Sequence, residues 1–358
     1  MNKFFRYPVI ILMFNFIFLP NHTQATEIFV DQKLKNDCIE NTYSVMGRSC
    51  NGDAGPAYRS IKQAIDAMST GDSIILRGGI YRVNHIRLPK SKNGTSWEKG
   101  NYNEIKSFEG EWAVLDGNNS LTDNPENGQC VIGYDHYDKT GSADLKYWKF
   151  ERLEIRNGRS KNGEYAYGFW GNGGPFWFRY CYIHDNLAAT PGHNPSGLTG
   201  MVWNGCLVEY CMFENNGATG DRASHHNSAH INIHSDYIPD DIAKYGISDR
   251  GFIDNGHHIQ KNVYRYNIFL GGTAVAIKYK NDQHFTGRNP AAGNGYVDTF
   301  KEYGDNIHHN IFLNTNSYAI DARQDFIQIH HNIIDSCSAG IIIGEPDTGT
   351  IYKAVVYN

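Results

Sequence analysis

The sequence lacks an excess of positive charge. Its 358 residues include 33 Lys and Arg against 38 Asp and Glu, which gives a formal net charge of -5 at pH 7. A protein that binds nucleic acid over a broad surface, or an acidic membrane through basic clusters, needs the opposite balance. We therefore expect neither partner, although a local basic groove for a polyanionic substrate remains compatible with this composition.

Long hydrophobic runs are also missing, apart from a short one at residues 9–19 that follows Lys3 and Arg6. This run is too short to cross a bilayer and has the length of a signal-peptide core. The small residue Ala25 ends a plausible cleavage site, and no Cys follows it, which argues against a lipid anchor. We predict a signal peptide at about residues 1–25 and a secreted or periplasmic mature chain; a buried N-terminal strand is the alternative.

Cysteine is sparse, with seven residues and no Cys-x-x-Cys or Cys/His spacing of a zinc site. An exported protein can form disulfides. Cys38 and Cys50 lie in a polar stretch near the mature N-terminus, and we expect them to pair. The residues that fall within apolar patterns and look like core fillers are Cys181, Cys206, Cys211 and Cys337.

Helical periodicity is nearly absent, which excludes helical repeat proteins, and the consensus of leucine-rich repeats is missing. From about residue 148 onward the chain repeats a strand of alternating residues, a polar corner and a second short strand. This pattern predicts a parallel β-helix, in which each coil buries its inward side chains by stacking on its neighbours. The first strands of the copies are residues 148–157, 176–185, 207–216, 263–271, 307–315 and 327–336.

One position can be aligned through all these copies. We expect its Asn residues at 310, 332 and 358 to stack as a ladder of side-chain amides, which satisfies buried polar groups at a corner. Unrelated turn residues are the alternative. The aligned residues are Leu153, Cys181, Cys211, Asn267, Asn310, Asn332 and Asn358.

An amphipathic helix is predicted at residues 57–68, with apolar side chains at 61, 64, 65 and 68, followed by a strand at 73–77. We expect the helix to cover the open end of the hydrophobic tube. The stretch from residue 28 to residue 82 resembles the N-terminal cap of secreted right-handed parallel β-helix proteins, including many bacterial polysaccharide lyases. The resemblance implies an all-β fold, with one right-handed parallel β-helix over residues 26–358 and its cap at about 26–82. Because this fold hosts lyases, hydrolases, epimerases and phage adhesins, it does not determine the activity.

The sequence ends within a copy of the repeat, since residues 354–358 begin another coil. An uncapped end would expose strand edges and core. We therefore expect that the reading frame is truncated or that a further domain is missing.

The second strands bring titratable side chains to one outer face. If Ile231, Ile277 and Ile320 point inward, then His234, Lys278 and Arg323 point outward on rungs about 4.8 Å apart. Three such groups repel each other unless an anion lies among them. The two longest insertions, residues 235–255 and 281–303, leave from the same edge and would wall a groove over these side chains.

A basic groove suits an acidic sugar. In elimination from a uronate, a base removes the proton at C5 while a cation neutralises the carboxylate. We assign Lys278 as the base, with Lys280 as its substitute, Arg323 as the bidentate partner of the carboxylate, and His234 as the acid or an orienting group. The further substrate-binding candidates are Asn232, Asp321, His230 and Tyr279.

The order of Lys278 and Arg323 on adjacent coils resembles that in the chondroitinase B and alginate lyase group of β-helix lyases. The resemblance implies that the Lys is the base, that the Arg assists, and that nearby Asn and Glu side chains hold calcium. The chain departs from this group because Asn232 and His234 stand where an acidic pair is expected. Calcium (Ca²⁺) is therefore allowed rather than implied, and its candidate ligands are Asp236, Asp240 and Asp241.

Three other interpretations stay open. A cluster of histidines could bind a transition metal: His225, His226, His230 and His234. Gly256-His257 and residues 276–278 weakly resemble elements of β-helix polygalacturonases, which would make the chain a glycoside hydrolase. Exposed aromatic side chains could stack on sugars in an enzyme or in a non-catalytic glycan-binding or adhesin protein; the candidates are Trp170, Trp177, Tyr279 and Tyr296. Our preferred interpretation is a monomeric, secreted polysaccharide lyase acting on an acidic polysaccharide.

Overall fold

The computed structural model describes residues 25–40, 42–121, 130–134, 145–163, 165–189, 194–201, 203, 205–218, 228–234, 262–272, 275–279, 304–324, 326–344 and 354–357. At residues 201 and 234 the description covers the backbone alone. The predicted signal peptide therefore lies outside the described residues, apart from Ala25.

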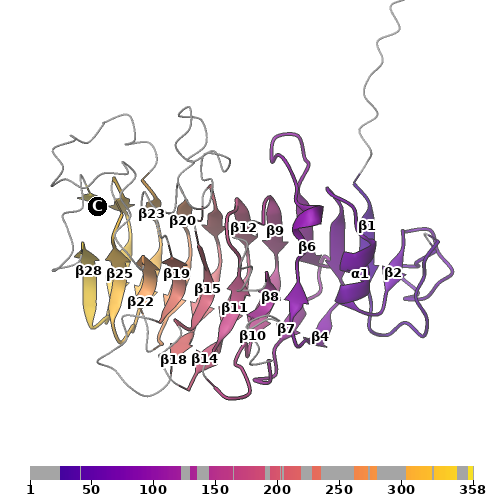
Figure 1. Cartoon of the computed structure of the whole chain (residues 1–358), viewed down its shortest axis with the longest axis horizontal. Helices are drawn as coiled ribbons and strands as arrows, with labels where there is room; N and C mark the ends of the chain where they lie inside the picture. Colours follow the sequence, from indigo (N-terminus) through magenta and orange to yellow (C-terminus); the bar gives the residue numbers. More distant parts are fainter. Residues whose placement is uncertain are drawn as a thin grey trace, which may run out of the picture.

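The described chain winds through three parallel sheets, one strand per sheet in each coil, along the long axis of the molecule (Figure 1). Sheet 1 runs in the order β2 (Ala57–Tyr58), β1 (Glu27–Val30), β3 (Ser73–Leu76), β6 (Asn103–Ser107), β9 (Trp148–Glu151), β12 (Phe176–Arg179), β16 (Leu207–Glu209), β20 (Val263–Arg265), β23 (Asn306–His308), β26 (Gln328–His330) and β29 (Val355–Tyr357). The predicted parallel β-helix is confirmed.

The other two sheets are built from the strands that follow in each coil. Sheet 2 consists of β4 (Gly79–Arg82), β7 (Ala113–Asp116), β10 (Leu153–Arg156), β13 (Tyr182–His184), β17 (Met212–Glu214), β21 (Ile268–Leu270), β24 (Ile311–Leu313) and β27 (Ile333–Asp335). Sheet 3 consists of β5 (Ile86–Arg87), β8 (Cys130–Gly133), β11 (Tyr167–Trp170), β15 (Ser196–Met201), β19 (Ala229–His234), β22 (Val275–Tyr279), β25 (Tyr318–Ala322) and β28 (Ala339–Ile343). A short pair, β14 (Leu187–Ala188) and β18 (Gly217–Ala218), lies at a corner.

Each coil has three strands rather than the two expected from the sequence. The predicted strand at residues 148–157 is two short strands, β9 and β10, with a bend at Arg152, whose φ is 54°. A left-handed residue turns the chain from sheet 1 to sheet 2 without a loop, so the alternation of apolar residues continues almost unbroken through the bend. The corner residues that share this conformation are Arg152, Tyr180, Tyr210, Tyr266, His309 and His331.

A continuous hydrophobic core fills the tube between the sheets. Inward residues of sheet 2 stack from coil to coil, and the rings of Phe213, Phe269 and Phe312 lie 4.9 Å apart. Each coil therefore buries its apolar face only through its neighbours, as expected for a solenoid.

The expected ladder of side-chain amides is confirmed as far as the described residues extend. Its members lie in register on neighbouring coils, and from Cys181 to Asn310 the backbone N–H of each member donates to the side chain of the next. The bonds run from Cys211 N–H to Asn267 Oδ1 (2.9 Å), from Asn267 N–H to Asn310 Oδ1 (3.0 Å) and from Asn310 N–H to Asn332 Oδ1 (2.9 Å). Asn358 lies outside the described residues.

The N-terminal end is covered by α1 (Ile61–Ala67), as predicted, with a 3-10 turn at η1 (Lys90–Lys92) further along (Figure 1). The helix starts four residues later than the sequence suggested, because residues 57–58 form β2 and the Ser60 hydroxyl accepts a hydrogen bond from the Gln63 N–H. Such capping fixes the first turn of a helix. The side chains buried over the first coil are Ile61, Ala64 and Ile65.

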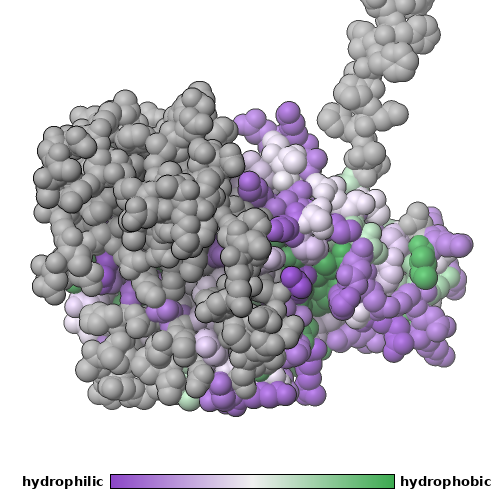
Figure 2. All heavy atoms as spheres, in the orientation of Figure 1, coloured by the Kyte–Doolittle hydropathy of each residue, from purple (hydrophilic) through white to green (hydrophobic). Residues whose placement is uncertain are grey.

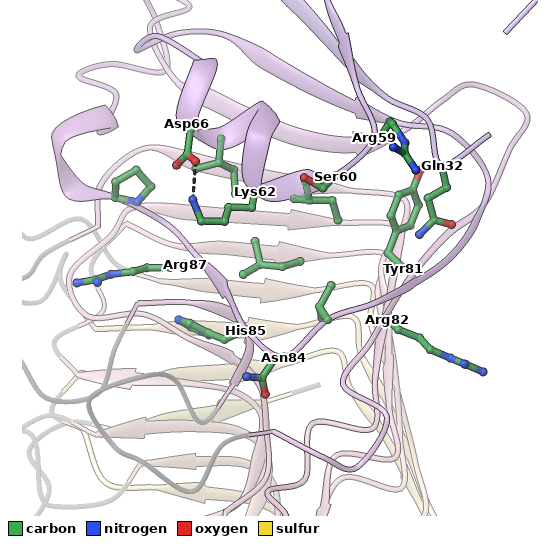
Figure 3. Close-up of a pocket in the computed structure, with 15 residues that line it drawn as sticks. Gln32, Arg59, Ser60, Lys62, Asp66, Tyr81, Arg82, Asn84, His85 and Arg87 are labelled. Atoms are coloured by element: carbon green, nitrogen blue, oxygen red, sulfur yellow. Dashed lines mark hydrogen bonds and ion pairs between the residues drawn. The ribbon is translucent and has the colours of Figure 1, made fainter. Parts of the chain in front are cut away.

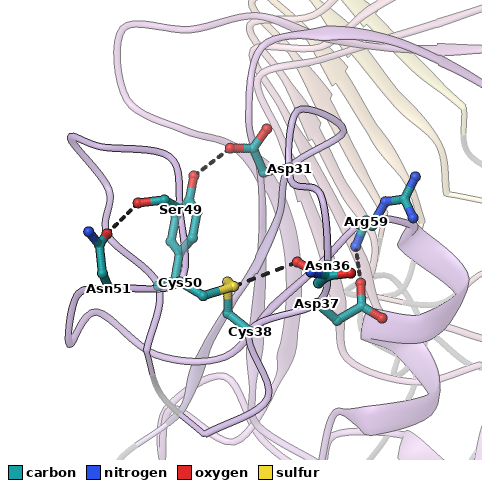
Figure 4. The surroundings of a disulfide bond; sticks show 9 residues. Asp31, Asn36, Asp37, Cys38, Ser49, Cys50, Asn51 and Arg59 are labelled. Carbon is teal, nitrogen blue, oxygen red and sulfur yellow. Dashed lines mark hydrogen bonds between the residues drawn. A yellow bond between two sulfur atoms is a disulfide. The ribbon is translucent and has the colours of Figure 1, made fainter.

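The predicted disulfide between Cys38 and Cys50 is confirmed and closes the loop beside β2 (Figure 4). Hydrophilic side chains cover most of the visible described surface at this end of the molecule, with small hydrophobic areas among them (Figure 2). Among the described residues, no helix has the length and hydropathy required to cross a membrane.

Candidate active site

Three polar side chains lie in register on adjacent strands of sheet 3. Asn232 on β19 pairs with Lys278 on β22, and Lys278 pairs with Asp321 on β25. Their neighbours Ile231 and Ile277 point into the core, so by alternation the polar residues project from the opposite face. We call Asn232, Lys278 and Asp321 the polar row.

The polar row is buried although it lies on the outward side of the sheet. The exposed fractions are 0% for Asn232, 2% for Lys278 and 1% for Asp321. We expected these side chains to line an exposed groove, and this expectation is wrong for them. Burial of a lysine and a carboxylate is costly without partners, so the row needs an electrostatic or functional explanation.

Arg323 completes this group through Asp321. Its Nε donates to Asp321 Oδ1 over 2.8 Å and its Nη2 donates to Oδ2 over 3.0 Å, a two-point ion pair that is itself buried. We expected this bidentate geometry between Arg323 and a substrate carboxylate. The carboxylate that Arg323 binds is Asp321, so its expected direct role is corrected to one that acts on Asp321. Opposite charges at an i, i+2 spacing on one strand face are a signal that could have predicted this pair.

The side-chain amide of Asn232 is buried with its hydrogen-bonding groups unsatisfied by the described part of the chain. Among the described residues, neither its Oδ1 nor its Nδ2 has a hydrogen-bond partner, although the residue is fully buried. Its backbone oxygen is held by the Thr199 hydroxyl at 2.8 Å, so the strand is anchored while the amide is not engaged. An unsatisfied buried amide costs about 1–3 kcal/mol, which marks it as a candidate ligand-binding group.

The expected alignment of His234, Lys278 and Arg323 is shifted by two residues. Lys278 lies opposite Asn232 rather than His234, and its other partner is Asp321 rather than Arg323. Lys278 and Arg323 still share one face of sheet 3, because a shift of two preserves the alternation. The backbone of His234 ends β19, and its side chain lies outside the description.

His230 does not face a groove, which corrects the expectation that it binds substrate. It is fully buried, its Nδ1 faces Asn216 Nδ2 at 3.1 Å and its Nε2 faces the Gly271 carbonyl oxygen at 3.0 Å. Burial lowers the pKa of His230 to about 4. A neutral ring with both nitrogens engaged is a structural residue of the corner.

Tyr279 is also a core residue rather than a sugar-binding one. It is fully buried, and its hydroxyl donates to Asp305 Oδ2 over 2.7 Å. Trp170, another aromatic expected at the surface, is 2% exposed and packs edge-on against Tyr167. Trp177 is half-buried and donates to Glu209 Oε1 over 3.2 Å.

Several predicted site residues lie outside the described residues and stay predictions. They are Lys280, the calcium candidates Asp236, Asp240 and Asp241, the histidines His225 and His226, the Gly256-His257 element and Tyr296.

A cavity of about 520 Å³ lies at the other end of the molecule, beneath α1 (Figure 3). Lys62 on its wall is paired with Asp66, and Arg82 and Arg87 extend away from its centre. It is five strands from β22 along sheet 3, or about 24 Å at the usual strand spacing. This cavity is therefore separate from the polar row.

No family model and no curated protein matches this sequence. Among solved structures, the chain is similar to the alginate lyase from Paenibacillus sp. strain FPU-7, with 13% identity and a TM-score of 0.40, over 83% of this chain and 96% of that one. The function therefore has to be inferred from the side chains of the site.

Proposed function

We propose that this chain is a secreted polysaccharide lyase that cleaves an acidic, uronate-containing polysaccharide by β-elimination, with Lys278 as the base. The observation that carries the proposal is the buried lysine in register between an unsatisfied amide, Asn232, and a carboxylate already neutralised by Arg323. A β-helix has no structural need for such a group on the outer side of a sheet.

The reaction requires an uncharged base beside a carboxylate. The base takes the C5 proton, the electrons of that bond form the C4–C5 double bond, and the C4–O bond breaks as the leaving oxygen gains a proton. Burial of an amino group away from water favours its neutral form over the ammonium form. A neutral amine can accept the C5 proton.

The pair of Arg323 and Asp321 supports this role of Lys278. An unpaired carboxylate one rung away would attract the ammonium form of the lysine and prevent it from acting as a base. The two-point contact with Arg323 cancels most of that charge. In this proposal Arg323 and Asp321 are positioning residues.

The remaining assignments complete the site. The free amide of Asn232 binds a substrate oxygen next to the reacting carbon, and His234, two residues further along β19, supplies the proton to the leaving group or orients it. Calcium held by Asp236, Asp240 and Asp241 would neutralise the substrate carboxylate, so activity should be measured with added calcium and with a chelator.

Hydrolysis is less well supported by the described residues. An inverting hydrolase needs two carboxyl groups around one water. In the polar row and Arg323, as far as the structure describes this face, Asp321 is the only carboxylate, and Arg323 occupies both of its oxygens.

The test is a panel of alginate, pectate and glycosaminoglycans, followed by the ultraviolet absorbance of unsaturated uronate and by a reducing-end assay. The proposal predicts both signals on at least one polymer, and Lys278→Ala should remove both. Lys149→Ala, which removes another buried lysine from sheet 1, is the matched control and should retain activity. Reducing ends without absorbance would indicate a hydrolase, and binding without either signal a glycan-binding protein; unchanged turnover in Lys278→Ala would reject its role as the base.

A further inference from the structure

Four histidines form a compact block at the corner between sheets 1 and 2. The sequence Ile-His-His-Asn occurs at residues 307–310 and again at 329–332, one coil later. His308 on β23 pairs in register with His330 on β26, and each is followed by a left-handed corner residue, His309 or His331. We call these four residues the histidine block.

The block has the geometry of converging ligands. Nδ1 of His308 lies 2.7 Å from Nδ1 of His309, and the same distance separates Nδ1 of His330 from Nδ1 of His331. One ligand nitrogen each from His308, His309 and His330 lies within 4.8 Å of the other two. Three imidazole nitrogens from two coils therefore surround one small volume.

Two imidazole nitrogens at this separation must share a proton or a cation, because two lone pairs repel each other. Two nitrogens bound at about 2.1 Å to one metal ion lie about 3.0 Å apart at the roughly 90° angle of a square-planar copper or nickel ion, and about 3.4 Å apart at a tetrahedral zinc ion. The observed 2.7 Å has to open by about 0.3 Å to bind a square-planar ion and by about 0.7 Å to bind a tetrahedral one. Imidazole ligands without a carboxylate suit zinc, copper and nickel rather than calcium or magnesium.

We propose that His308, His309 and His330 bind one divalent transition-metal ion of the zinc, nickel or copper class. The ion clips two successive coils together at their outer corner. This site is independent of the proposed lyase activity, since the polar row lies on sheet 3 and the histidine block lies at the edge of sheet 1.

The surroundings hold the rings in place. The ring of Tyr357 stacks on His330 at 4.9 Å, and Tyr266 packs against His309 at 5.2 Å. Rings fixed by their neighbours lose little freedom on binding a ligand, which favours affinity.

The positive charge of Arg265 would repel a metal ion bound at the histidine block. Arg265 lies on the neighbouring strand β20, in register with His308. Its guanidinium is paired with Glu209, with Nη2 and Oε2 2.7 Å apart, which reduces its repulsion of a bound ion.

The test uses the full mature chain without a histidine tag, stripped with a chelator and titrated with Zn²⁺ or Ni²⁺ in a calorimeter. We expect one ion per chain. His309→Asn should weaken binding by at least about a hundredfold, a loss of about 2.7 kcal/mol or greater, so that Zn²⁺ at the wild-type Kd leaves this variant almost unbound. Asn tolerates the left-handed conformation of residue 309, whose φ is 56°, so this variant should retain the fold.

His184→Asn is the control for unspecific binding to histidines. His184 lies on sheet 2 and contacts Asp185 and Glu154, away from the block. The His184→Asn substitution should leave the affinity for Zn²⁺ or Ni²⁺ unchanged. A second measurement is thermal unfolding, in which Zn²⁺ should raise the midpoint of the wild type and of His184→Asn but not of His309→Asn. No binding by the wild type, or equal affinities of the wild type and His309→Asn, would overturn the proposal.

Discussion

Replacement of Asn310 by Ala is expected to destabilise the β-helix strongly. The Asn310 amide is fully buried in the ladder and makes four side-chain hydrogen bonds. Its Oδ1 accepts from the backbone N–H and the Nδ2 of Asn267, both at 3.0 Å. Its Nδ2 donates to the Tyr264 carbonyl oxygen at 2.9 Å and to Asn332 Oδ1 at 3.1 Å.

The size of the loss follows from which of these groups lose their partners. The Asn267 N–H loses its side-chain acceptor, whereas Asn267 Nδ2 keeps the Val208 carbonyl oxygen and Asn332 Oδ1 keeps the Asn310 N–H. A buried donor without a partner costs about 1–3 kcal/mol, and the partly satisfied groups add less, so we expect a loss of about 2–4 kcal/mol.

The ladder itself suggests a graded variant. Two coils before Asn310 in the same ladder, the Cys211 sulfur accepts a hydrogen bond from the N–H of Cys181 at 3.4 Å, so a thiol can serve as a weak acceptor at this position. Asn310→Cys should therefore lose less stability than Asn310→Ala. A thiol cannot replace the two amide donors, so it should not restore the wild-type value.

The assay is urea unfolding at constant pH, with the midpoint and slope compared among variants. The control is Asn316→Ala, since Asn316 is exposed and makes no side-chain hydrogen bond with the described residues. It should shift the free energy of unfolding by less than about 0.5 kcal/mol. Equal losses in Asn310→Ala and Asn316→Ala would refute the inference that the ladder stabilises the fold.

Two further predictions concern stability. The pKa of His230 falls to about 4 in the folded chain, so the unfolded state takes up the proton first, and about 3 kcal/mol of stability present above pH 6.5 should be lost as the pH falls toward 4. Urea midpoints at pH 7 and pH 5 should therefore differ more in the wild type than in His230→Asn, and equal differences would contradict this. Gly200→Ala should cost about 3 kcal/mol or more, because its Cβ would lie 1.7 Å from a backbone oxygen of the neighbouring coil. Gly340→Ala, where no atom lies within 4 Å, should be nearly neutral in the same unfolding experiment.

The repeat and its ladder of side-chain amides could be predicted because stacking imposes the same demand on every coil. Position 310 must satisfy a buried N–H from the coil before it, and so must positions 267 and 332, which is why one residue type recurs there. A second ladder escaped prediction because its members differ chemically. Its bonds run from the Cys206 N–H to Asn262 Oδ1, from the Asn262 N–H to Asp305 Oδ1 and from the Asp305 N–H to Gln324 Oε1. Different side chains that accept the same kind of hydrogen bond leave no repeated letter to find.

The number of strands per coil was missed for a related reason. The inward residues Phe150 and Leu153 are three apart, which breaks strict alternation at the corner residue Arg152. The same step of three separates Phe178 from Cys181. A repeated step of three between inward residues is the sequence signal of a left-handed corner, because that residue turns the chain while the core continues on both sides.

The register of the site could not be fixed by alternation alone. Two strands with apolar residues at every second position can slide by two and keep every apolar side chain inward. Such a shift moves the outward groups by about 7 Å along the strand, which decides whether Lys278 faces His234 or Asn232. The register in the structure places Tyr279 inward beside Ile233, where its hydroxyl reaches Asp305. A buried tyrosine hydroxyl needs such a partner. Asp305 belongs to the next coil and follows the long insertion in the sequence. The hydrogen-bond partner that favours this register of β19 and β22 is therefore distant from both strands in the sequence.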